Sequence, residues 1–557
     1  MSWPRPARLV AWTLLLAAAV GQVRVWSSDR GFWLDELSVA INLRERAWSE
    51  LPGGLEYYQV APVGWLAVTK ALREWVGEAE VVLRLPSLVA GVALLVLTMV
   101  IARRAVGEWA SAVAVGLVGF SPTLLYYSGE LKQYAVETAV ALGLLLLGDE
   151  LLRRDPQRRQ GAEQENGWRW PVLAAGAGLV AVAVTLSYSA LIVLAGVTAG
   201  LAAIFAARRQ WPAMAVLFLA AAPAAALGVG LAWYRRLYPL APNQDTWFAH
   251  GMPVPGAGVG DVVAWLPQTW TGFVASPLGW RSGWWTLGLV AIGLVALLRR
   301  GRGHWAAMAA GVLAMAMVAA VLRGYPLADR VALYLVTPVI LLVVAGVDGV
   351  ARGVRWVARQ IQLVPATAAG TAAAVVAAVA VVMPGPPVGD GVQQMLAPPD
   401  RDRGREVLAD LAGRVRPGDV VIANWFAEQL GRWYGLEVAG LVRMAPAEDP
   451  QLCRPDSVDA LLAGASRAWY LHGAPPGSEP ADHTVRVAAQ LAQRGRIVDA
   501  WTLGEDGLSN EPGWILLDLT AGPDPTPPTV EPHPDFACLT ETEGVANEHQ
   551  LTRGGRS

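Results

Sequence analysis

The sequence has few charged side chains and almost no cysteine. Of its 557 residues, 16% are Asp, Glu, Lys or Arg and only two are Cys. Ordinary soluble proteins carry roughly 25% charged residues. This deficit argues against one large soluble core and favours a chain embedded in a lipid bilayer. The sequence also lacks the basic arm or patch of nucleic-acid-binding proteins, so we expect no nucleic-acid partner.

The sequence motifs of common soluble enzymes are missing as well. There is no P-loop, no GxGxxG after a strand, no HExxH and no GxSxG in a fitting context. The two cysteines, Cys453 and Cys538, have no CxxC or histidine cluster beside them, so they do not form a metal site. An oxidising compartment would permit a disulfide between them, and the pairing is left open. We predict no cofactor, and a divalent metal is left open.

Long apolar segments are abundant in this sequence, which is 54% hydrophobic. A membrane span needs about 20 mainly apolar residues. Eleven segments qualify, with approximate cores at 7–26, 85–104, 108–127, 133–152, 171–188, 189–207, 211–232, 283–299, 305–322, 331–350 and 364–383. We therefore predict an α-helical polytopic membrane protein with about 11 transmembrane helices. The first segment could instead be a cleaved signal peptide, but it lacks a clear small-residue cleavage site, which favours a retained span.

The basic residues predict the orientation of these spans. If the N-terminus is cytoplasmic, the basic loops all fall on the cytoplasmic side: 103–104, 153–169, 208–209, 299–304 and 352–359. The weaker apolar stretch 61–76 is charged, and we predict that it forms an interfacial amphipathic helix. We expect a multi-pass protein of the cell (inner or plasma) membrane, with its C-terminal part extracytoplasmic.

The composition changes near residue 384. We predict a transmembrane core at 1–383 that contains a catalytic outer loop at 27–84, followed by a Pro/Gly linker at 384–399. Short apolar strands at 420–424, 467–473 and 514–520, with helices at 401–415 and 485–495, predict a small extracytoplasmic α/β domain at 400–520. The Pro-rich tail 521–557 is expected to be disordered.

Adjacent carboxylates, Asp35 and Glu36, lie in the first outer loop. Neighbouring side chains point in different directions, so we expect only one of the two to face a reacting centre. Capping of the following helix by Asp35 is the simpler interpretation. The aromatic and apolar residues 32–34 favour a partly desolvated carboxylate with raised basicity.

Three further groups could contact a substrate. Glu56 and Tyr57 lie in the same loop beside Tyr58 and Gln59, where they would contact a sugar or form an ordinary polar loop. In the segment 126–138, the spacing i, i+3, i+4, i+7 predicts one polar helix face. Such a face points into an interior cavity or snorkels at the interface; its members are Glu130, Gln133, Tyr134 and Glu137.

Arg330 forms the last group, at the outward mouth of the span 331–350. Its guanidinium is well matched to a phosphate, although an arginine here could also anchor the span at the interface.

Five segments together resemble a known family. They are WLDELSVA, QVAPVGWLAVTK, VVLRLPSLVAGVALL, YYSGELKQYAVETAVAL and GYPLADRVALYLVTPVI. Across roughly residues 1–350 the chain is similar to the bacterial GT-C membrane glycosyltransferases. The most similar branch is family-39-like, akin to protein O-mannosyltransferases and the lipid A aminoarabinose transferase.

The resemblance implies a polyprenyl-phosphate-linked sugar donor, used on the extracytoplasmic face with inversion at the anomeric carbon. Asp35 matches the catalytic acid position of the family, and Glu36 is its partner. Lys132 and Arg330 match contacts to the donor phosphate. The sequence departs from many relatives at QVAPVG, where they have a Pro-Pro pair.

Two other functions fit the same chain. A transporter or lipid flippase would place ionisable residues or broken helices near the bilayer midplane. In this sequence the acids gather at the predicted outer rim, which favours a transferase acting on an extracytoplasmic glycan, lipid or protein. A non-catalytic protein that binds prenyl lipids is the third alternative.

Overall fold

The structure is a computed structural model. It describes residues 5–57, 59–153, 170–236 and 248–360, and beyond them 388–398, 404–423, 425–435, 443–446, 462–473, 488–502 and 513–525, with scattered positions within 370–379 and at 459. The chain divides into two compact units. Unit 1 consists of Met1–Ser28 and Asn42–Pro399, and unit 2 consists of Asp29–Ile41 and Asp400–Ser557. Each unit is described by itself.

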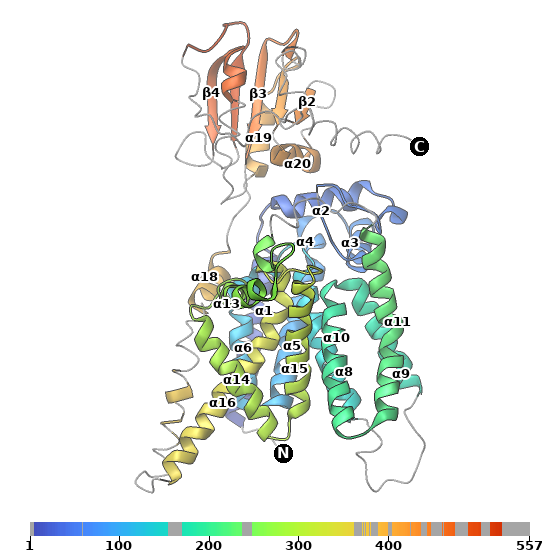
Figure 1. Cartoon of the computed structure of the whole chain (residues 1–557). Helices are drawn as coiled ribbons and strands as arrows, with labels where there is room; N and C mark the ends of the chain where they lie inside the picture. Colours follow the sequence, from blue (N-terminus) through green and yellow to red (C-terminus); the bar gives the residue numbers. More distant parts are fainter. Residues whose placement is uncertain are drawn as a thin grey trace. The chain divides into compact units, whose positions relative to one another are not determined.

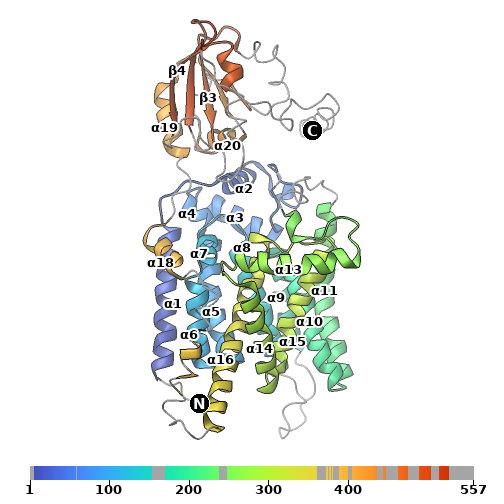
Figure 2. The same ribbon diagram turned by 60° about the vertical axis from the view of Figure 1, so that its left-hand side comes forward.

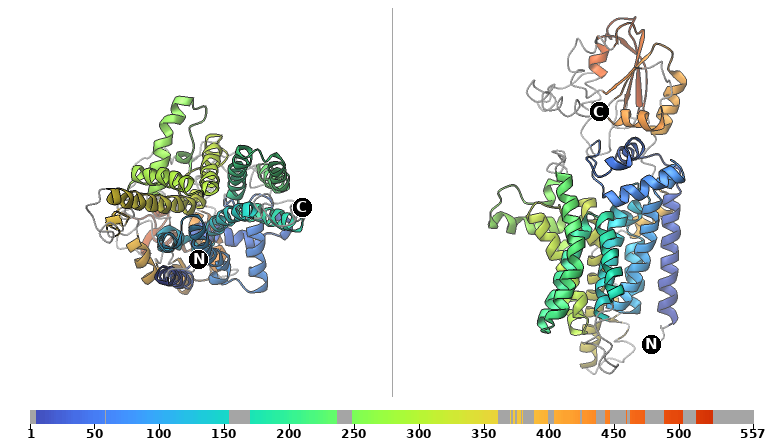
Figure 3. Two further views of the ribbon diagram at one scale, coloured as in Figure 1. Left: turned by 90° about the horizontal axis from the view of Figure 1, so that it is seen from below. Right: turned by 90° about the vertical axis from the view of Figure 1, so that its right-hand side faces the viewer.

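Unit 1 is a bundle of long helices that pack side by side (Figures 1 and 3). Its long elements are α1 (Arg5–Trp26), α5 (Leu85–Ala105), α6 (Glu108–Gly119), α7 (Pro122–Ser128), α8 (Tyr134–Arg153), α9 (Trp170–Leu186), α10 (Ser189–Ala207), α11 (Trp211–Arg236), α14 (Gly283–Arg299), α15 (Gly303–Val321) and α16 (Val336–Gln360). Ten of the predicted apolar segments coincide with these helices, α6 and α7 sharing one segment. The eleventh, 364–383, lies largely outside the described residues.

The chain is an α-helical polytopic membrane protein with a small C-terminal α/β domain. Within the described part of the chain, six helices are long and apolar enough to cross a membrane, or seven if the bent pair α6 and α7 is one span. The axes of that pair differ by 66°. The helices α9 and α14 are apolar but shorter, and α8 carries three acids near its ends.

Glycines allow two helices of the bundle to approach closely. Gly196 and Gly200 of α10 form a GxxxG pair that faces α15. A Cβ atom on Gly196 would lie 2.5 Å from the backbone nitrogen of Val312, and one on Gly200 would lie 2.5 Å from the carbonyl oxygen of Ala307. Small residues give such close backbone contact in membranes, where packing rather than water exclusion holds helices together.

A buried carboxylate joins three helices of the bundle. Asp149 of α8 is 1% exposed and lies 2.9 Å from Nη1 of Arg104 in α5 and 2.7 Å from Nε of Arg153. Its other oxygen lies 3.0 Å from Nε2 of His304 in α15. The cations compensate the cost of burying this acid. They lie at helix ends that the sequence places on the cytoplasmic side.

Shorter elements cover the end of unit 1 opposite to the start of α1 (Figure 2). They are η1 (Trp48–Glu50), α3 (Val63–Trp75), α4 (Glu80–Leu83), η3 (Ala249–Gly251), α13 (Val259–Ala275) and η4 (Asp329–Leu335). The helix α3 confirms that the stretch 61–76 is helical. Within the predicted linker 384–399, α18 (Val388–Leu396) is helical, and its last carbonyl accepts a hydrogen bond from Arg24 Nη2 at 2.8 Å.

Unit 2 contains a mixed five-stranded sheet of order β2-β1-β3-β5-β4. β1 is parallel to β2 and β3, whereas β5 is antiparallel to β3 and β4. The strands are β1 (Val420–Ala423), β2 (Arg443–Pro446), β3 (Arg467–His472), β4 (Arg496–Thr502) and β5 (Gly513–Asp518), and the helices are α19 (Gly404–Arg414) and α20 (Trp425–Tyr434). The predicted strands and the helix 401–415 match β1, β3, β5 and α19. The sequence missed the edge strands β2 and β4, which carry charges or proline rather than an apolar run.

Candidate functional site

The acidic pair lies in the first turn of α2 (Leu34–Glu45). Glu36 is 1% exposed, and its Oε2 accepts a hydrogen bond from the backbone N–H of Trp33 at 3.0 Å. This is the reciprocal half of a capping box, in which the third helical residue reaches back to the residue before the helix. Glu36 therefore has the capping role that the simpler interpretation of the sequence assigned to Asp35, which is half-buried one residue earlier.

The last turn of α2 lies in unit 1, where it holds the loop that contains Glu56. The side chain of Asn42 donates to the carbonyl of Glu56 at 3.2 Å and accepts from its N–H at 2.8 Å. The next residue, Tyr57, has a φ of 56°, in the left-handed region. Sequence reasoning missed Asn42, because a single Asn in a helix carries no local signal of this pairing.

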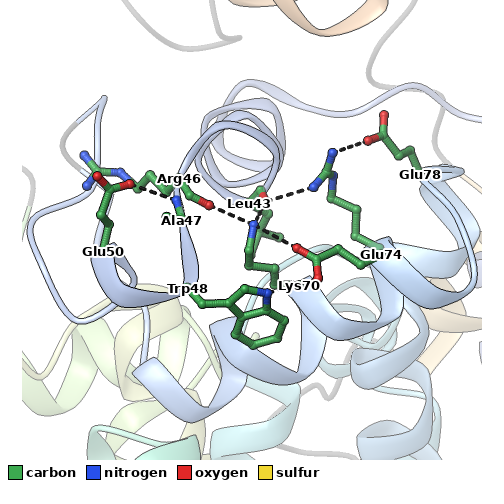
Figure 4. A network of polar contacts seen from close by, with 9 residues as sticks. Leu43, Arg46, Ala47, Trp48, Glu50, Lys70, Glu74 and Glu78 are labelled. Atoms are coloured by element: carbon green, nitrogen blue, oxygen red, sulfur yellow. Dashed lines mark hydrogen bonds and ion pairs between the residues drawn. The ribbon is translucent and has the colours of Figure 1, made fainter.

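A lysine from α3 holds the C-terminal end of α2 (Figure 4). Nζ of Lys70 donates to the carbonyl oxygens of Leu43 at 2.9 Å and Arg46 at 2.8 Å, and it pairs with Glu74 at 3.2 Å. Arg73 adds a further hydrogen bond to the carbonyl of Leu43 at 3.3 Å. Positive charge is stabilising at the C-terminus of a helix, where carbonyl groups point outward.

A break at residues 129–133 separates α7 from α8, between the predicted segments 108–127 and 133–152. The predicted polar face is therefore wrong in part, because Glu130 and Gln133 lie in this break and not on α8, which begins at Tyr134. The break is nevertheless buried: Glu130 is 2% exposed, and Lys132 and Gln133 are each 5% exposed. Buried ionisable residues in a membrane protein usually serve function, because burying them costs free energy.

The break contacts the loop after Tyr57. Nζ of Lys132 donates to Oε1 of Gln59 at 2.7 Å, and Nε2 of Gln133 donates to the carbonyl of Val60 at 3.3 Å. The structure thus brings together two groups that the sequence identified 73 residues apart. Oε1 of Gln133 is buried and has no hydrogen-bond partner among the described residues, so it can accept a hydrogen bond from a bound hydroxyl.

The chain contains only two lysines, Lys70 and Lys132, whereas its other basic residues are arginines. Both lysines are buried, at 3% and 5% exposure. The ammonium group is compact and has three donors, and arginine is planar and larger. These are the two positions where the chain has the smaller cation.

Two tyrosines that the sequence analysis did not select contact Glu137 of α8, and one of them, Tyr188, also contacts the loop. The hydroxyl of Tyr188 donates to the carbonyl of Ala61 at 2.8 Å, and its backbone N–H donates to Glu137 at 3.3 Å. The hydroxyl of Tyr325 donates to the other oxygen of Glu137 at 3.4 Å. Tyr188 also lines a mostly apolar cavity of about 50 Å³ with Pro62, Val63, Thr185, Leu191 and Leu231.

Arg330 lies in the first turn of η4, and its guanidinium carbon is 5.7 Å from the centre of the Phe248 ring. The preceding residue, Asp329, has a φ of 42°. Its carboxylate accepts a hydrogen bond from Oγ of Ser276 at 2.9 Å and lies 3.1 Å from Nε2 of His250. These two contacts hold the backbone beside Arg330. They join residues that are distant in sequence, so the sequence alone does not predict them.

The candidates divide between the units: Asp35 and Glu36 belong to unit 2, and Glu56, Tyr57, Glu130, Lys132, Gln133, Tyr134 and Arg330 belong to unit 1. Tyr58, Cys453 and Cys538 lie outside the described residues. Within the described part of the chain, no group of three or more His, Cys, Asp or Glu side chains is arranged to hold a metal ion.

Comparison with known proteins gives one family and several solved structures. Residues 80–429 match DUF6541, described as a family of unknown function. ArnT from Cupriavidus metallidurans, bound to undecaprenyl phosphate, is 15% identical, with 92% of this chain and 99% of that chain covered and a TM-score of 0.48. The archaeal oligosaccharyltransferase AglB from Archaeoglobus fulgidus, in complex with an inhibitory peptide and a dolichol-phosphate, is 11% identical, with coverage of 91% and 74% and a TM-score of 0.49. Both are GT-C family members. No curated protein matches the sequence.

Proposed function

The chain belongs to DUF6541, a family of unknown function, and we propose that it is an integral membrane glycosyltransferase. Its donor is a sugar linked to polyprenyl phosphate, and its acceptor is an extracytoplasmic glycan, lipid or protein. The reaction takes place at the extracytoplasmic face of the cell membrane, with the N-terminus cytoplasmic and residues 400–520 outside.

The observation that carries this proposal is the buried break between α7 and α8. Lys132 supplies an ammonium group there, and Gln133 supplies a buried amide oxygen without a partner among the described residues. An ammonium group suits a phosphate, and an amide oxygen suits a sugar hydroxyl. Both side chains are hydrogen-bonded to the segment Gln59–Val60 and are therefore oriented before a ligand binds.

Asp35 is the proposed general base. It takes the proton of the acceptor hydroxyl while that oxygen forms a bond to the anomeric carbon of the sugar. The bond from this carbon to the phosphate oxygen breaks at the same time, and polyprenyl phosphate leaves with the electron pair. The configuration of the anomeric carbon is inverted. Glu36 supports Asp35 by holding the first turn of α2, through its hydrogen bond to Trp33.

The other candidates bind substrate in this proposal. Lys132 and Arg330 contact the donor phosphate and stabilise the charge that develops on it. Glu56, Tyr57, Glu130, Gln133 and Tyr134 contact sugar hydroxyls. The prenyl chain remains in the bilayer, which accounts for a donor site at the rim of a membrane bundle.

The test is transfer from a radiolabelled polyprenyl-phosphate sugar in membranes that contain the full-length protein. We expect Asp35→Asn to abolish formation of a labelled product. Asp29→Asn is the matched control, because Asp29 is in the same loop but its side chain is 94% exposed, and its ion pair with Arg405 adds little. Normal transfer by Asp35→Asn would remove this residue as the base.

A transporter or lipid flippase is the second candidate, and the broken span favours it. Transporters commonly build their binding sites from discontinuous helices, and α6 and α7 form a pair of helices bent by 66°, which is followed by buried charges at 130 and 132. The same assay separates the two functions. A flippase would move the labelled lipid across vesicle membranes without forming a new glycosidic bond. No labelled product would then form with the wild type or with Asp35→Asn.

A further inference from the structure

The segment that bears the acidic pair packs with the C-terminal domain. Asp29–Ile41 and Asp400–Ser557 form one compact unit. Oγ of Ser38, in α2, lies 2.5 Å from Oε1 of Gln429, in α20, and both residues are fully buried. The hydroxyl donates to the amide oxygen, and the two residues are 391 positions apart in the chain.

A second contact fixes the residues just before α2. The backbone N–H of Phe32 donates to the hydroxyl of Tyr434 at 2.6 Å. The Phe32 ring, which is fully buried, meets Trp433 edge to face, with ring centres 5.6 Å apart. Aromatic pairs of this geometry stabilise a contact beyond the area that they bury. Residues from the middle and the C-terminal end of α20 therefore hold the segment from which α2 begins.

The choice of glutamine at position 429 is informative. Its neighbours on the buried side of α20, Ala427 and Leu430, are apolar and fully buried, and apolar packing alone would not need an amide there. Burying an amide costs free energy unless it is hydrogen-bonded, whereas a hydrogen-bonded amide fixes one arrangement of the two groups. Gln429 thus specifies the rotation and register of α2 rather than only covering it.

Ser38 lies three residues after Asp35, so the two side chains share one face of α2. We propose that Gln429 is a positioning residue that orients Asp35 through Ser38, and that the C-terminal domain is therefore a working part of the transferase. This inference rests on the proposed function, in which Asp35 is the base. A displacement of a base by about 1 Å can lower a rate by as much as 100-fold.

The test compares Gln429→Met with Ser38→Ala in the full-length protein, in the transfer assay described above. Methionine has a similar size but cannot accept the hydrogen bond. We expect each variant to lower kcat about tenfold or more while the KM for the donor changes less than about twofold, because donor contacts are unaltered. The double variant should be no slower than Ser38→Ala alone, because Ser38→Ala already removes the interaction that Gln429→Met removes. Ser38→Ala also removes the hydrogen bond from this hydroxyl to the carbonyl of Leu34 at 2.9 Å. Gln490→Met, at an exposed position in the same domain, is the matched control and should keep the wild-type kcat.

Hydrogen exchange of the full-length protein gives a readout that does not depend on activity. Gln429→Met should speed exchange of the amides in 29–41 and leave β3 and β5 unchanged. If the exchange of β3 and β5 also rises, Gln429→Met has disturbed the C-terminal domain itself, and the kcat of Ser38→Ala is the test, because residue 38 lies outside the C-terminal sequence. A wild-type kcat in Ser38→Ala overturns the positioning role. Wild-type kcat in Gln429→Met overturns it as well.

The failure of this inference differs from that of the proposed function. Absence of transfer by the wild-type protein would remove the proposed function, and normal transfer by Asp35→Asn would remove Asp35 as the base. An inactive Asp35→Asn together with a fully active Gln429→Met would remove only the role of the C-terminal domain.

Discussion

Trp33 and Glu36 are joined by a hydrogen bond of 3.0 Å from the backbone N–H of the first to the carboxylate of the second. This bond gives adjacent carboxylates different tasks. Glutamine also serves in a capping box, so Glu36→Gln should keep transfer and thermal stability close to those of the wild type. Glu36→Ala should lower the free energy of unfolding by about 1 kcal/mol, measured by thermal unfolding in detergent. If Glu36→Gln were as inactive as Asp35→Asn, Glu36 would have to act in the chemistry.

The two lysines should give different kinetic phenotypes. Lys132→Met is expected to raise the KM for the donor at least tenfold and to weaken binding of undecaprenyl phosphate, because the proposed phosphate contact is lost. Lys132→Arg should restore little, since a planar guanidinium does not fit a buried site shaped for an ammonium group. Steady-state kinetics and calorimetry with undecaprenyl phosphate measure both effects. An unchanged donor KM in Lys132→Met would exclude the phosphate role.

Loss of the second lysine should affect stability. Lys70→Met removes the ammonium donor from the carbonyl of Arg46 and leaves the carbonyl of Leu43 with only the longer hydrogen bond from Arg73, and an unsatisfied buried polar group costs about 1–3 kcal/mol. We expect a lower melting temperature and faster hydrogen exchange of residues 41–47. Glu78→Gln is the control, because this half-exposed acid pairs with Arg73 at the surface and should change the free energy of unfolding by less than about 1 kcal/mol. Equal effects of the two changes would contradict the capping role.

The contact between α10 and α15 predicts a strong effect of side-chain size. Gly196→Leu would force the two helices apart, because a Cβ atom already meets the backbone of Val312. Overpacking costs typically about 1–3 kcal/mol, and here backbone rather than a side chain would have to move. Gly178→Leu in α9 is the matched control, since no atom lies within 4 Å of its Cβ position. Thermal unfolding of both variants in one detergent tests this prediction.

The C-terminal domain should lose stability in mild acid. His472 in β3 is fully buried, and burial lowers its pKa from 6.5 to about 4. Between pH 6.5 and pH 4, this histidine therefore binds a proton in the unfolded state but not in the folded state. Stability is complete above that pH and falls as the pH drops from 6.5 to 4, by a total on the order of 3 kcal/mol.

Substitution of this histidine tests the pH effect. Neither ring nitrogen of His472 has a hydrogen-bond partner among the described residues, so His472→Phe removes the titrating group without breaking a hydrogen bond. Hydrogen exchange of β3 and β5 should increase between pH 7 and pH 4.5 in the wild type and much less in His472→Phe. An equal increase in both proteins would assign the pH effect to other groups.

Much of the fold was predictable because the bilayer imposes a simple rule. An apolar run of about 20 residues must satisfy its backbone within a helix, so the runs alone identify α1, α5 and α10. Buried strands such as β1 and β3 were likewise visible as short apolar segments. The break at 129–133 lies where the sequence leaves a gap between the predicted segments 108–127 and 133–152, but its burial was not predictable, because the sequence places these polar residues at the outer rim.

The candidate site was predictable only in its residue types. The acids, the lysine and the amides were recognisable in the sequence, but the bond from Lys132 to Gln59 and the capping by Glu36 depend on backbone geometry. The pairing of Ser38 with Gln429 depends on chain segments 391 residues apart. No local pattern encodes such a contact.

The sequence by itself determined that this chain crosses a membrane, that a small α/β domain follows, and that carboxylates gather in one loop, because hydrophobic length and residue chemistry are local properties. Only the tertiary structure decided which carboxylate caps α2, where the buried cations lie, and that the segment 29–41 packs with the C-terminal domain. Those outcomes depend on packing between distant segments, where burial makes each polar group find a particular partner.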